Sequence, residues 1–343
     1  MANGEWRLWR SLIWEKMPLF AIAAIDALLT MIAQHAAGPQ RYPLAIRVGN
    51  ALLSYARYIG MALWPPHLAL MYLHPGLALR WSQVAMATLL LILISAFVIA
   101  ERRRRYLLVG WLWYLGTLIP MIGLVQVDVQ ALADRYAYVS FIGLYIMICW
   151  GVPDLLQAWR HARLALTAAS LAVLLVLTAM THRQVGYWSD PINLWSHTLD
   201  VTGDNWVADF HLGRAYWQQN QRERALEYFH HVSAERPRDP VLYQYIANIE
   251  QERGNPQQAI VYYEKALTFT LDAAASTEIR ANLCRAYSQA GDLARARQCF
   301  DAAAASHPAA AASSGVNWQG DWWRDLGPQM WARFRAWISG ESR

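Results

Sequence analysis

The stretch Glu101–Val152 decides the fold of the first half of the chain. It reads ERRRR, YLLVGWLWYLGTLIPMIGLV, QVDVQALADRYAY and VSFIGLYIMICWGV, in that order. Two apolar runs flank a polar loop, and a helix needs about 20 such residues to cross a bilayer. Clustered arginines in short loops stay on the cytoplasmic side of a membrane. The sequence therefore predicts a membrane hairpin whose arginine end, Arg102–Arg105, lies inside and whose polar loop lies outside.

The same charge rule orients the neighbouring apolar runs. It predicts a membrane domain over residues 1–183 with five spans, near 18–34, 82–100, 106–125, 139–152 and 164–181. The N-terminus is then cytoplasmic, and everything after about residue 181 lies outside. Because the chain is rich in Arg and Ala and poor in Lys, we expect a bacterial source. The outside is then the periplasm, and the membrane is the bacterial inner membrane.

Composition fits a chain that is part membrane and part soluble. Of its 343 residues 56% are hydrophobic and 16% are charged, yet the mean hydropathy is only +0.12. The net charge of +5 comes mostly from the arginines that set the topology, so we expect no nucleic-acid partner. The histidines of the outer side, His35, His67 and His74, lack the spacing of metal ligands. We therefore expect no metal and no cofactor.

Polar and aromatic residues gather in the loop that the hairpin places outside. Asp134, Arg135, Tyr136 and Tyr138 stand at the depth where lipid headgroups would lie. The planar fork of arginine binds phosphate oxygens, and tyrosine hydroxyls add donors. We interpret these residues as a site for a lipid phosphate. The alternative is an Asp134–Arg135 pair that caps a short helix.

An amphipathic stretch over residues 47–63 precedes the second span. Its apolar residues recur at helical spacing and are Val48, Leu52, Tyr55, Ile59 and Leu63. This pattern predicts a helix that lies in the membrane interface, with these side chains on its apolar face.

The second half of the chain repeats itself every 34 residues. HLGRAY at 211–216 and RALEYF at 224–229 return, so that Gly213 maps to Ala247 and Phe229 to Tyr263. A third copy follows after a longer joint. This period is typical of tetratricopeptide repeats. We predict an all-α fold, in which a bundle of about five transmembrane helices precedes a repeat solenoid over residues 184–308. The solenoid holds a half-repeat and three repeats, near 206–239, 240–273 and 277–308.

Such arrays present a concave surface to a protein partner. The first helix of each repeat puts polar residues and one tryptophan on this inner face, and the candidates for partner binding are Phe210, Arg214, Trp217, Gln218, Gln244, Asn248, Gln251, Arg285 and Gln289. We interpret the face as a site for an extended peptide, with Trp217 as a hot spot. The alternative is a solvated surface that only stacks the repeats.

The cysteines and the C-terminus leave further choices. Cys284 and Cys299 fall on the two helices of the third repeat, on the oxidising side, where a disulfide is chemically allowed. Because both positions lie at core contacts, we favour two packed thiols. Residues 309–343 hold a flexible joint and a basic amphipathic helix with Trp322, Trp323, Trp331, Phe334 and Trp337. This helix could cap the solenoid, lie on the membrane or dock into a partner.

Four segments carry a resemblance to a known family. They are IWEKMPLFAIAA at 13–24, RVGNALLSYARYIGMALWPPHLALMYLHP at 47–75, LLVGWLWYLGTLIPMIGLVQVDVQALADRYAYVSFIGLY at 107–145 and THRQVGYWSDPINLWSHTL at 181–199. Together they resemble the C-terminal half of bacterial relatives of the transmembrane-and-tetratricopeptide (TMTC) family. These are GT-C type glycosyltransferases, and the resemblance implies a sugar taken from a polyprenyl-phosphate carrier and attached to protein on the outer face.

The chain departs from that family in one respect. Family members carry their catalytic acids in the first outer loop of further N-terminal spans, and this sequence begins after that region. We therefore expect the chain not to catalyse transfer alone, and to act as scaffold, assembly factor or accessory subunit of a membrane complex. The rival hypothesis is a component of a split glycosyltransferase, in which Arg135, Tyr136 and Asp134 hold a polyprenyl phosphate.

Overall fold

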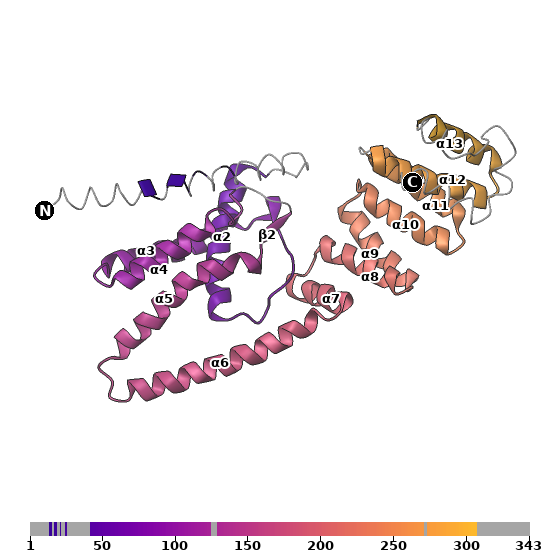
Figure 1. Ribbon diagram of the computed structural model, residues 1–343. Helices are drawn as coiled ribbons and strands as arrows, with labels where there is room; N and C mark the ends of the chain where they lie inside the picture. Colours follow the sequence, from indigo (N-terminus) through magenta and orange to yellow (C-terminus); the bar gives the residue numbers. More distant parts are fainter. Residues whose placement is uncertain are drawn as a thin grey trace. The chain divides into compact units, whose positions relative to one another are not determined.

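The computed structural model of the chain (Figure 1) describes residues 14–15, 17–18, 21, 25, 42–124, 129–270 and 273–306. The described part is almost entirely α-helical, as predicted, and the chain divides into two compact units, Met1–Tyr187 and Trp188–Arg343. The predicted span 18–34 lies almost wholly outside the described residues. So does the whole C-terminal segment 309–343, with Trp322, Trp323, Trp331, Phe334 and Trp337.

Two helices of the first unit form the predicted hairpin, α4 (Arg105–Leu118) and α5 (Ala137–Leu156). Their backbones touch at two glycines. A Cβ added to Gly110 would lie 2.5 Å from the Gly143 carbonyl oxygen, and one added to Gly143 would lie 2.3 Å from the Gly110 carbonyl oxygen. Small residues allow this close approach of helices.

Helix α4 is shorter than the predicted span 106–125. It ends at Leu118 because Pro120 has no N–H with which to continue the backbone ladder. The carbonyl oxygen of Gly116 accepts instead from the Ile119 N–H, at 3.4 Å.

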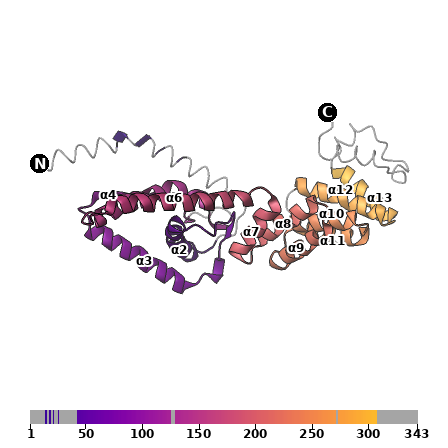
Figure 2. The same cartoon turned by 90° about the horizontal axis from the view of Figure 1, so that it is seen from below.

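Helix α2 (Leu44–Leu63) packs against α3 (Trp81–Ala100), and in Figure 2, where it is seen nearly end-on, it runs across α3. Its buried side differs from the predicted apolar face. Asn50 is fully buried and donates through Nδ2 to the Ala131 carbonyl oxygen at 3.1 Å, whereas the side chain of Leu63 is 64% exposed. Asn50 is inside because its amide binds a backbone group of the loop before α5.

Two short strands tie that loop to the segment after α2. The first, β1 (Tyr72–Leu73), pairs antiparallel with β2 (Gln130–Leu132). The Tyr58 hydroxyl donates to the Ala133 carbonyl oxygen at 2.9 Å and accepts from the Ala133 N–H at 3.0 Å. These bonds position the residues directly before α5, including those of the predicted lipid-phosphate site.

Three of the described helices are long and apolar enough to cross a membrane, namely Trp81–Ala100, Asp134–Leu156 and Ala162–Tyr187. They coincide with the predicted spans 82–100, 139–152 and 164–181. Nearly all side chains of α6 (Ala162–Tyr187) are exposed within its unit, although its sequence is strongly apolar. An exposed apolar helix of this length is expected to contact lipid.

The described part of the second unit contains a single leading helix and three helix pairs. The leading helix is α7 (Pro191–Thr202), at the position of the predicted half-repeat. The pairs stack in chain order in both views (Figures 1 and 2) and are α8 (Trp206–Gln218) with α9 (Arg222–Glu235), α10 (Pro240–Glu252) with α11 (Pro256–Phe269), and α12 (Ala273–Gln289) with α13 (Leu293–Ser306).

A residue in the left-handed region ends the first helix of each pair. Asn220, Gly254 and Gly291 have φ values of 64°, 79° and 80°. Asparagine and glycine tolerate this conformation, so the chain can turn back at once into the second helix.

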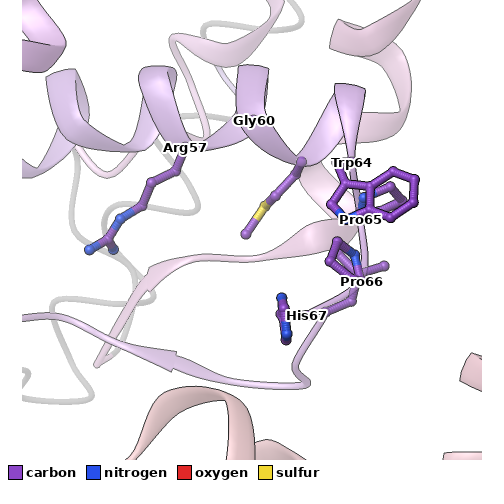
Figure 3. Close-up of a pocket in the computed structure, with 8 residues that line it drawn as sticks. Arg57, Gly60, Trp64, Pro65, Pro66 and His67 are labelled. Carbon is purple, nitrogen blue, oxygen red and sulfur yellow. The ribbon is translucent and has the colours of Figure 1, made fainter.

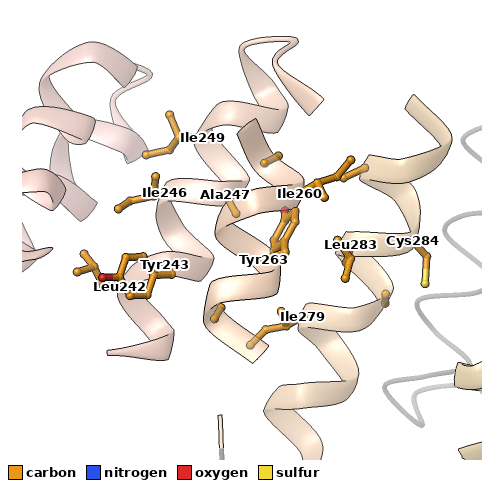
Figure 4. Packing of buried hydrophobic residues seen from close by; sticks show 14 of the residues in the cluster. Leu242, Tyr243, Ile246, Ala247, Ile249, Ile260, Tyr263, Ile279, Leu283 and Cys284 are labelled. Atoms are coloured by element: carbon orange, nitrogen blue, oxygen red, sulfur yellow. The ribbon is translucent and has the colours of Figure 1, made fainter. Parts of the chain in front are cut away.

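The core of the second unit is continuous from one pair to the next. Figure 4 shows Tyr263 of α11 lying between Ala247 of α10 and Leu283 of α12. The ring fills the space that the small residue leaves, as the 34-residue pattern predicts. Phe229 fills the same place in the first repeat, where a Cβ on Gly213 would lie 2.8 Å from its ring.

The third repeat corrects one prediction. Cys284 of α12 and Cys299 of α13 form a disulfide with a Cα–Cα distance of 5.5 Å, and are not two packed thiols. Cys284 occupies the small-residue position of α12, and this position packs against α13. The core contact for which we had expected two packed thiols therefore brings the two sulfur atoms together.

Candidate functional site

The inner face of the solenoid is the surface that α8, α10 and α12 form, and several of the predicted partner-binding residues make side-chain contacts there. Side-chain hydrogen bonds join successive repeats across it. They run from Trp217 Nε1 to Glu252 Oε2 at 3.0 Å, from Gln244 Nε2 to Glu278 Oε1 at 3.0 Å, and from Gln251 Nε2 to Gln289 Oε1 at 2.7 Å. These side chains are therefore held in place before any partner arrives.

The second helix of the middle repeat positions the central amides. Tyr263 of α11 is fully buried, and its hydroxyl donates to Asn248 Oδ1 at 2.6 Å. The same hydroxyl lies 2.9 Å from Gln251 Oε1. The ring that packs the core thus also orients two amides of the inner face. Arg285 of the third repeat is half-buried on α12.

A group of aromatic rings lies where the first two repeats meet. Phe210 and Trp217 both contact Tyr245 edge-on, with ring centroids 5.5 Å and 5.3 Å away. The Arg214 guanidinium lies 5.7 Å from the Tyr245 ring centroid. We call Phe210, Arg214, Trp217 and Tyr245 the aromatic patch. All four side chains are half-buried, so each keeps a surface that a partner can contact.

The Arg214 guanidinium group of the aromatic patch is available to a partner. No ion pair to Arg214 is found among the described residues, although Arg222 at the rim pairs with Glu252 at 3.1 Å. His211 stacks on Trp195 of α7 with ring centroids 4.2 Å apart. Burial, and then the charge of Arg214, lowers the pKa of His211. The patch therefore carries one positive charge, from Arg214, at neutral pH.

The predicted lipid-phosphate residues lie in the loop before α5 and in the first turn of that helix, and two of the four contact each other. Asp134 faces Tyr72, with 3.4 Å between the Tyr72 hydroxyl and Asp134 Oδ2. Arg135 is exposed over the Tyr136 ring, 5.1 Å from its centroid, and Tyr138 is 79% exposed on α5. Asp134 and Tyr136 are thus half-buried, whereas Arg135 and Tyr138 are exposed.

Asp134 and Tyr72 form a polar pair that sequence reasoning missed. Asp134 Oδ1 is buried and has no hydrogen-bond partner in the part of the chain that the structure describes. The Tyr72 hydroxyl accepts from the Ala69 N–H at 2.7 Å, and burial, followed by the Asp134 carboxylate, raises the pKa of this phenol. Tyr72 therefore stays protonated and can donate to an oxygen.

A cleft of about 390 Å³ lies next to this pair. Arg57 extends into it from α2 and His67 from the loop that follows α2, as Figure 3 shows, and apolar side chains including Met61 and Trp64 line the rest. The Tyr72 hydroxyl lies 3.4 Å from the His67 carbonyl oxygen. Sequence reasoning missed this cleft because its residues follow no motif and meet only where the chain after α2 turns back against the end of that helix.

No group of three or more histidine, cysteine or acidic side chains that could hold a metal ion is found in the described ranges. The second unit and the loop before α5 present hydrogen-bond donors, rings and arginines.

Comparisons with known proteins identify the repeats. Two models of the tetratricopeptide repeat match the chain, over residues 210–241 and 251–315. Tetratricopeptide repeats are thus present in the C-terminal region, and repeats of this kind commonly mediate protein–protein interaction. The comparison with curated proteins gives no match. The resemblance to TMTC glycosyltransferases stays a prediction.

Several solved structures are similar at low identity. Two crystal structures of MamA are 14% and 16% identical, cover 47% and 50% of this chain and 95% and 96% of their own chains, and have TM-scores of 0.35 and 0.33. The crystal structure of BtubC (BKLC) from P. vanneervenii is 16% identical, covers 81% of this chain and 94% of its own, and has a TM-score of 0.33. Scores this low carry no argument, so the repeats rest on the family models and on the helix pairs.

Proposed function

We propose that the chain is a membrane-anchored repeat protein that holds a protein partner on the inner face of its solenoid. It would serve as scaffold, assembly factor or accessory subunit of a membrane complex. The observation that carries the proposal is the aromatic patch beside a set of amides that hydrogen bonds already fix in place. Aromatic residues and arginine supply most of the energy at protein interfaces.

The fixed amides favour tight binding. A side chain that is ordered only on binding costs about 0.5–1.5 kcal/mol of entropy, and an inner face with preset rotamers avoids much of that cost. The backbone groups of an extended peptide could form hydrogen bonds with Gln244 and Asn248. An acidic or carbonyl oxygen of the peptide could then lie near Arg214. The preferred partner is therefore a protein segment that carries apolar and acidic residues.

The anchoring part of the proposal rests on the apolar helices of the first unit. Helices α3, α5 and α6 meet the length and composition needed to cross a bilayer. Leu174 and Leu175, in the middle of α6, are 62% and 64% exposed within the unit. In water this surface would promote aggregation, whereas lipid would cover it.

The Cys284–Cys299 disulfide supports an outward, periplasmic position for the repeats. Disulfides persist in oxidising compartments and are rare in the cytosol of ordinary bacteria. The arginines between α3 and α4 independently favour a cytoplasmic position for the opposite end of the membrane hairpin.

A photo-crosslinker tests the proposed binding face. We would replace Gln218, which is exposed at the end of α8, with p-benzoylphenylalanine, and use Glu227 on α9 of the same repeat as the matched control. We expect a crosslinked protein partner in cells from position 218 and none from position 227. Equal crosslinking from both positions would contradict a specific inner-face site.

A second candidate function is a component of a polyprenyl-phosphate-dependent protein glycosyltransferase. The observation that favours it is the cleft beside the Tyr72–Asp134 pair, because Arg57 could bind a phosphate oxygen while the apolar walls take the first isoprene units. A short-chain polyprenyl phosphate is the probe. Arg57→Gln should weaken its binding at least 10-fold by native mass spectrometry, and Arg80→Gln, an exposed control, should leave it unchanged.

A further inference from the structure

Five exposed arginines lie at two turns of the first unit, and the function proposed above does not use them. Arg102 and Arg103 lie in the turn between α3 and α4, and Arg105 begins α4, while Arg160 lies in the turn between α5 and α6, and Arg163 is in the first turn of α6. We call these five residues the arginine patch. Arg104, in the α3–α4 turn, pairs with Glu101 at 3.5 Å and is not included.

The structure brings the two turns to the same end of the unit. The Tyr106 hydroxyl, one residue after Arg105, donates to Asp154 Oδ2 near the end of α5 at 2.8 Å. A Cβ on Gly151 would lie 3.7 Å from the Tyr106 ring, so the first turn of α4 packs directly on the last turns of α5. This contact fixes the α3–α4 turn beside the residues that lead into Arg160.

The charges of the patch are not neutralised within the described residues. Asp154 is the nearby carboxylate, and the hydrogen bond to its side chain comes from a tyrosine. None of the five guanidinium groups takes part in an ion pair within the described part of the chain, where Glu101 is engaged by Arg104. Positive charge is therefore concentrated here without an internal counterion.

Apolar side chains border the patch, and they identify its ligand. Leu155 and Leu164 flank the α5–α6 turn and are 72% and 74% exposed, and Trp159, which precedes Arg160, is 49% exposed. A ligand that satisfies both features has an anionic phosphate and hydrocarbon chains. Tryptophan and arginine occur together at the headgroup level of membranes for the same reason.

We propose that the arginine patch binds the headgroups of anionic phospholipids such as phosphatidylglycerol. The guanidinium fork matches the phosphate oxygens, and the adjacent leucines contact the first methylenes of the acyl chains. The inference rests on the proposed membrane anchoring and adds a lipid preference to it. Each arginine near an anionic surface contributes roughly a fivefold gain in binding.

The test has two arms that separate this inference from the anchoring itself. The purified full chain is first floated with vesicles of neutral phosphatidylcholine. It is then titrated in mild detergent with short-chain phosphatidylglycerol and, as neutral control, short-chain phosphatidylcholine, with native mass spectrometry counting the bound lipid. We expect flotation with neutral vesicles and at least 10-fold tighter binding of phosphatidylglycerol.

Charge variants locate the site. Replacing Arg102, Arg103 and Arg105 together with Gln should weaken phosphatidylglycerol binding roughly 100-fold, while the same residues changed to Lys should keep most of it, which controls for folding. Arg238→Gln with Arg280→Gln and Arg297→Gln, three exposed arginines of the second unit, is the charge-matched control and should have no effect.

Each result is decisive for one part of the proposal. A chain that floats but binds both lipids equally would overturn the lipid preference alone. A chain that does not float would overturn the anchoring and the preference together. Competition by inorganic phosphate at the same concentration as the lipid would show a site for soluble phosphate and would also refute the inference.

Discussion

Reducing the Cys284–Cys299 disulfide should destabilise the third repeat by an amount that can be worked out from the chain. The bond joins residues 15 positions apart. In the chain-entropy account, closing a loop of that size lowers the conformational entropy of the unfolded state by about 10 cal/mol/K, which corresponds to about 3 kcal/mol at 25 °C. Reduction leaves both sulfur atoms in place. It therefore changes the constraint without opening a cavity at Cys284, which is fully buried.

Hydrogen exchange resolved by mass spectrometry is the appropriate assay, because it reports each repeat separately. Lowering the free energy of opening by about 3 kcal/mol speeds hydrogen exchange roughly 100-fold. We expect this acceleration for amides in α12 and α13. Amides in α8 and α9 should change little, because repeats communicate mainly with their direct neighbours.

Two controls complete this test. The oxidised chain should contain one free thiol, Cys149, and Cys149→Ala should show the same exchange as the natural sequence under both conditions. Three free thiols before reduction, or identical exchange in α12 with and without reductant, would refute the disulfide and the reasoning about compartment that depends on it.

Further predictions concern packing, hydrogen bonding and pH. Gly143→Ala should separate α4 from α5 and lower the thermal stability of the first unit by about 1–3 kcal/mol, because its Cβ would meet the Gly110 carbonyl oxygen at 2.3 Å. Tyr263→Phe should cost about 1 kcal/mol in urea unfolding of the second unit by removing the bond to Asn248. Burial lowers the pKa of His211, so its contribution to stability is present above about pH 6.5 and is lost as the pH falls below it. His211→Gln should flatten this decline in thermal melts from pH 7 to pH 5.

The repeats could be predicted because their packing is local and periodic. Gly213 and Phe229 recur 34 residues later as Ala247 and Tyr263, and each small residue contacts the aromatic ring of its own pair. Side chains at fixed helical spacing leave a signal in the sequence. Two of the hydrogen bonds between repeats span 35 and 34 residues, close to this period, and start from Trp217 and Gln244, which the helical spacing predicts on one face.

The Tyr72–Asp134 pair and the cleft beside it could not be predicted in this way. Tyr72 and Asp134 are 62 residues apart, and Arg57 and His67 meet at the cleft only because the chain turns back after α2. The helical wheel of α2 did not indicate that Asn50 would be buried to bind a backbone carbonyl group. Periodicity indicates which residues share a face of a helix, but it does not indicate which face a polar contact will bury.

The disulfide and the arginine patch support one further prediction together, because under the proposed topology the arginine turn is cytoplasmic and the repeats are periplasmic. A disulfide at Cys284 requires an oxidising compartment, and clustered arginines after α3 favour the cytoplasm. In a Cys149→Ala background, a cysteine in place of Arg103 should resist an impermeant maleimide in intact cells and react after the cells are opened. A cysteine in place of Gln257, which is exposed on the second unit, should react in both. If Arg103→Cys reacts in intact cells, the arginine turn lies outside, and the orientation inferred from charge is wrong even if the disulfide is present.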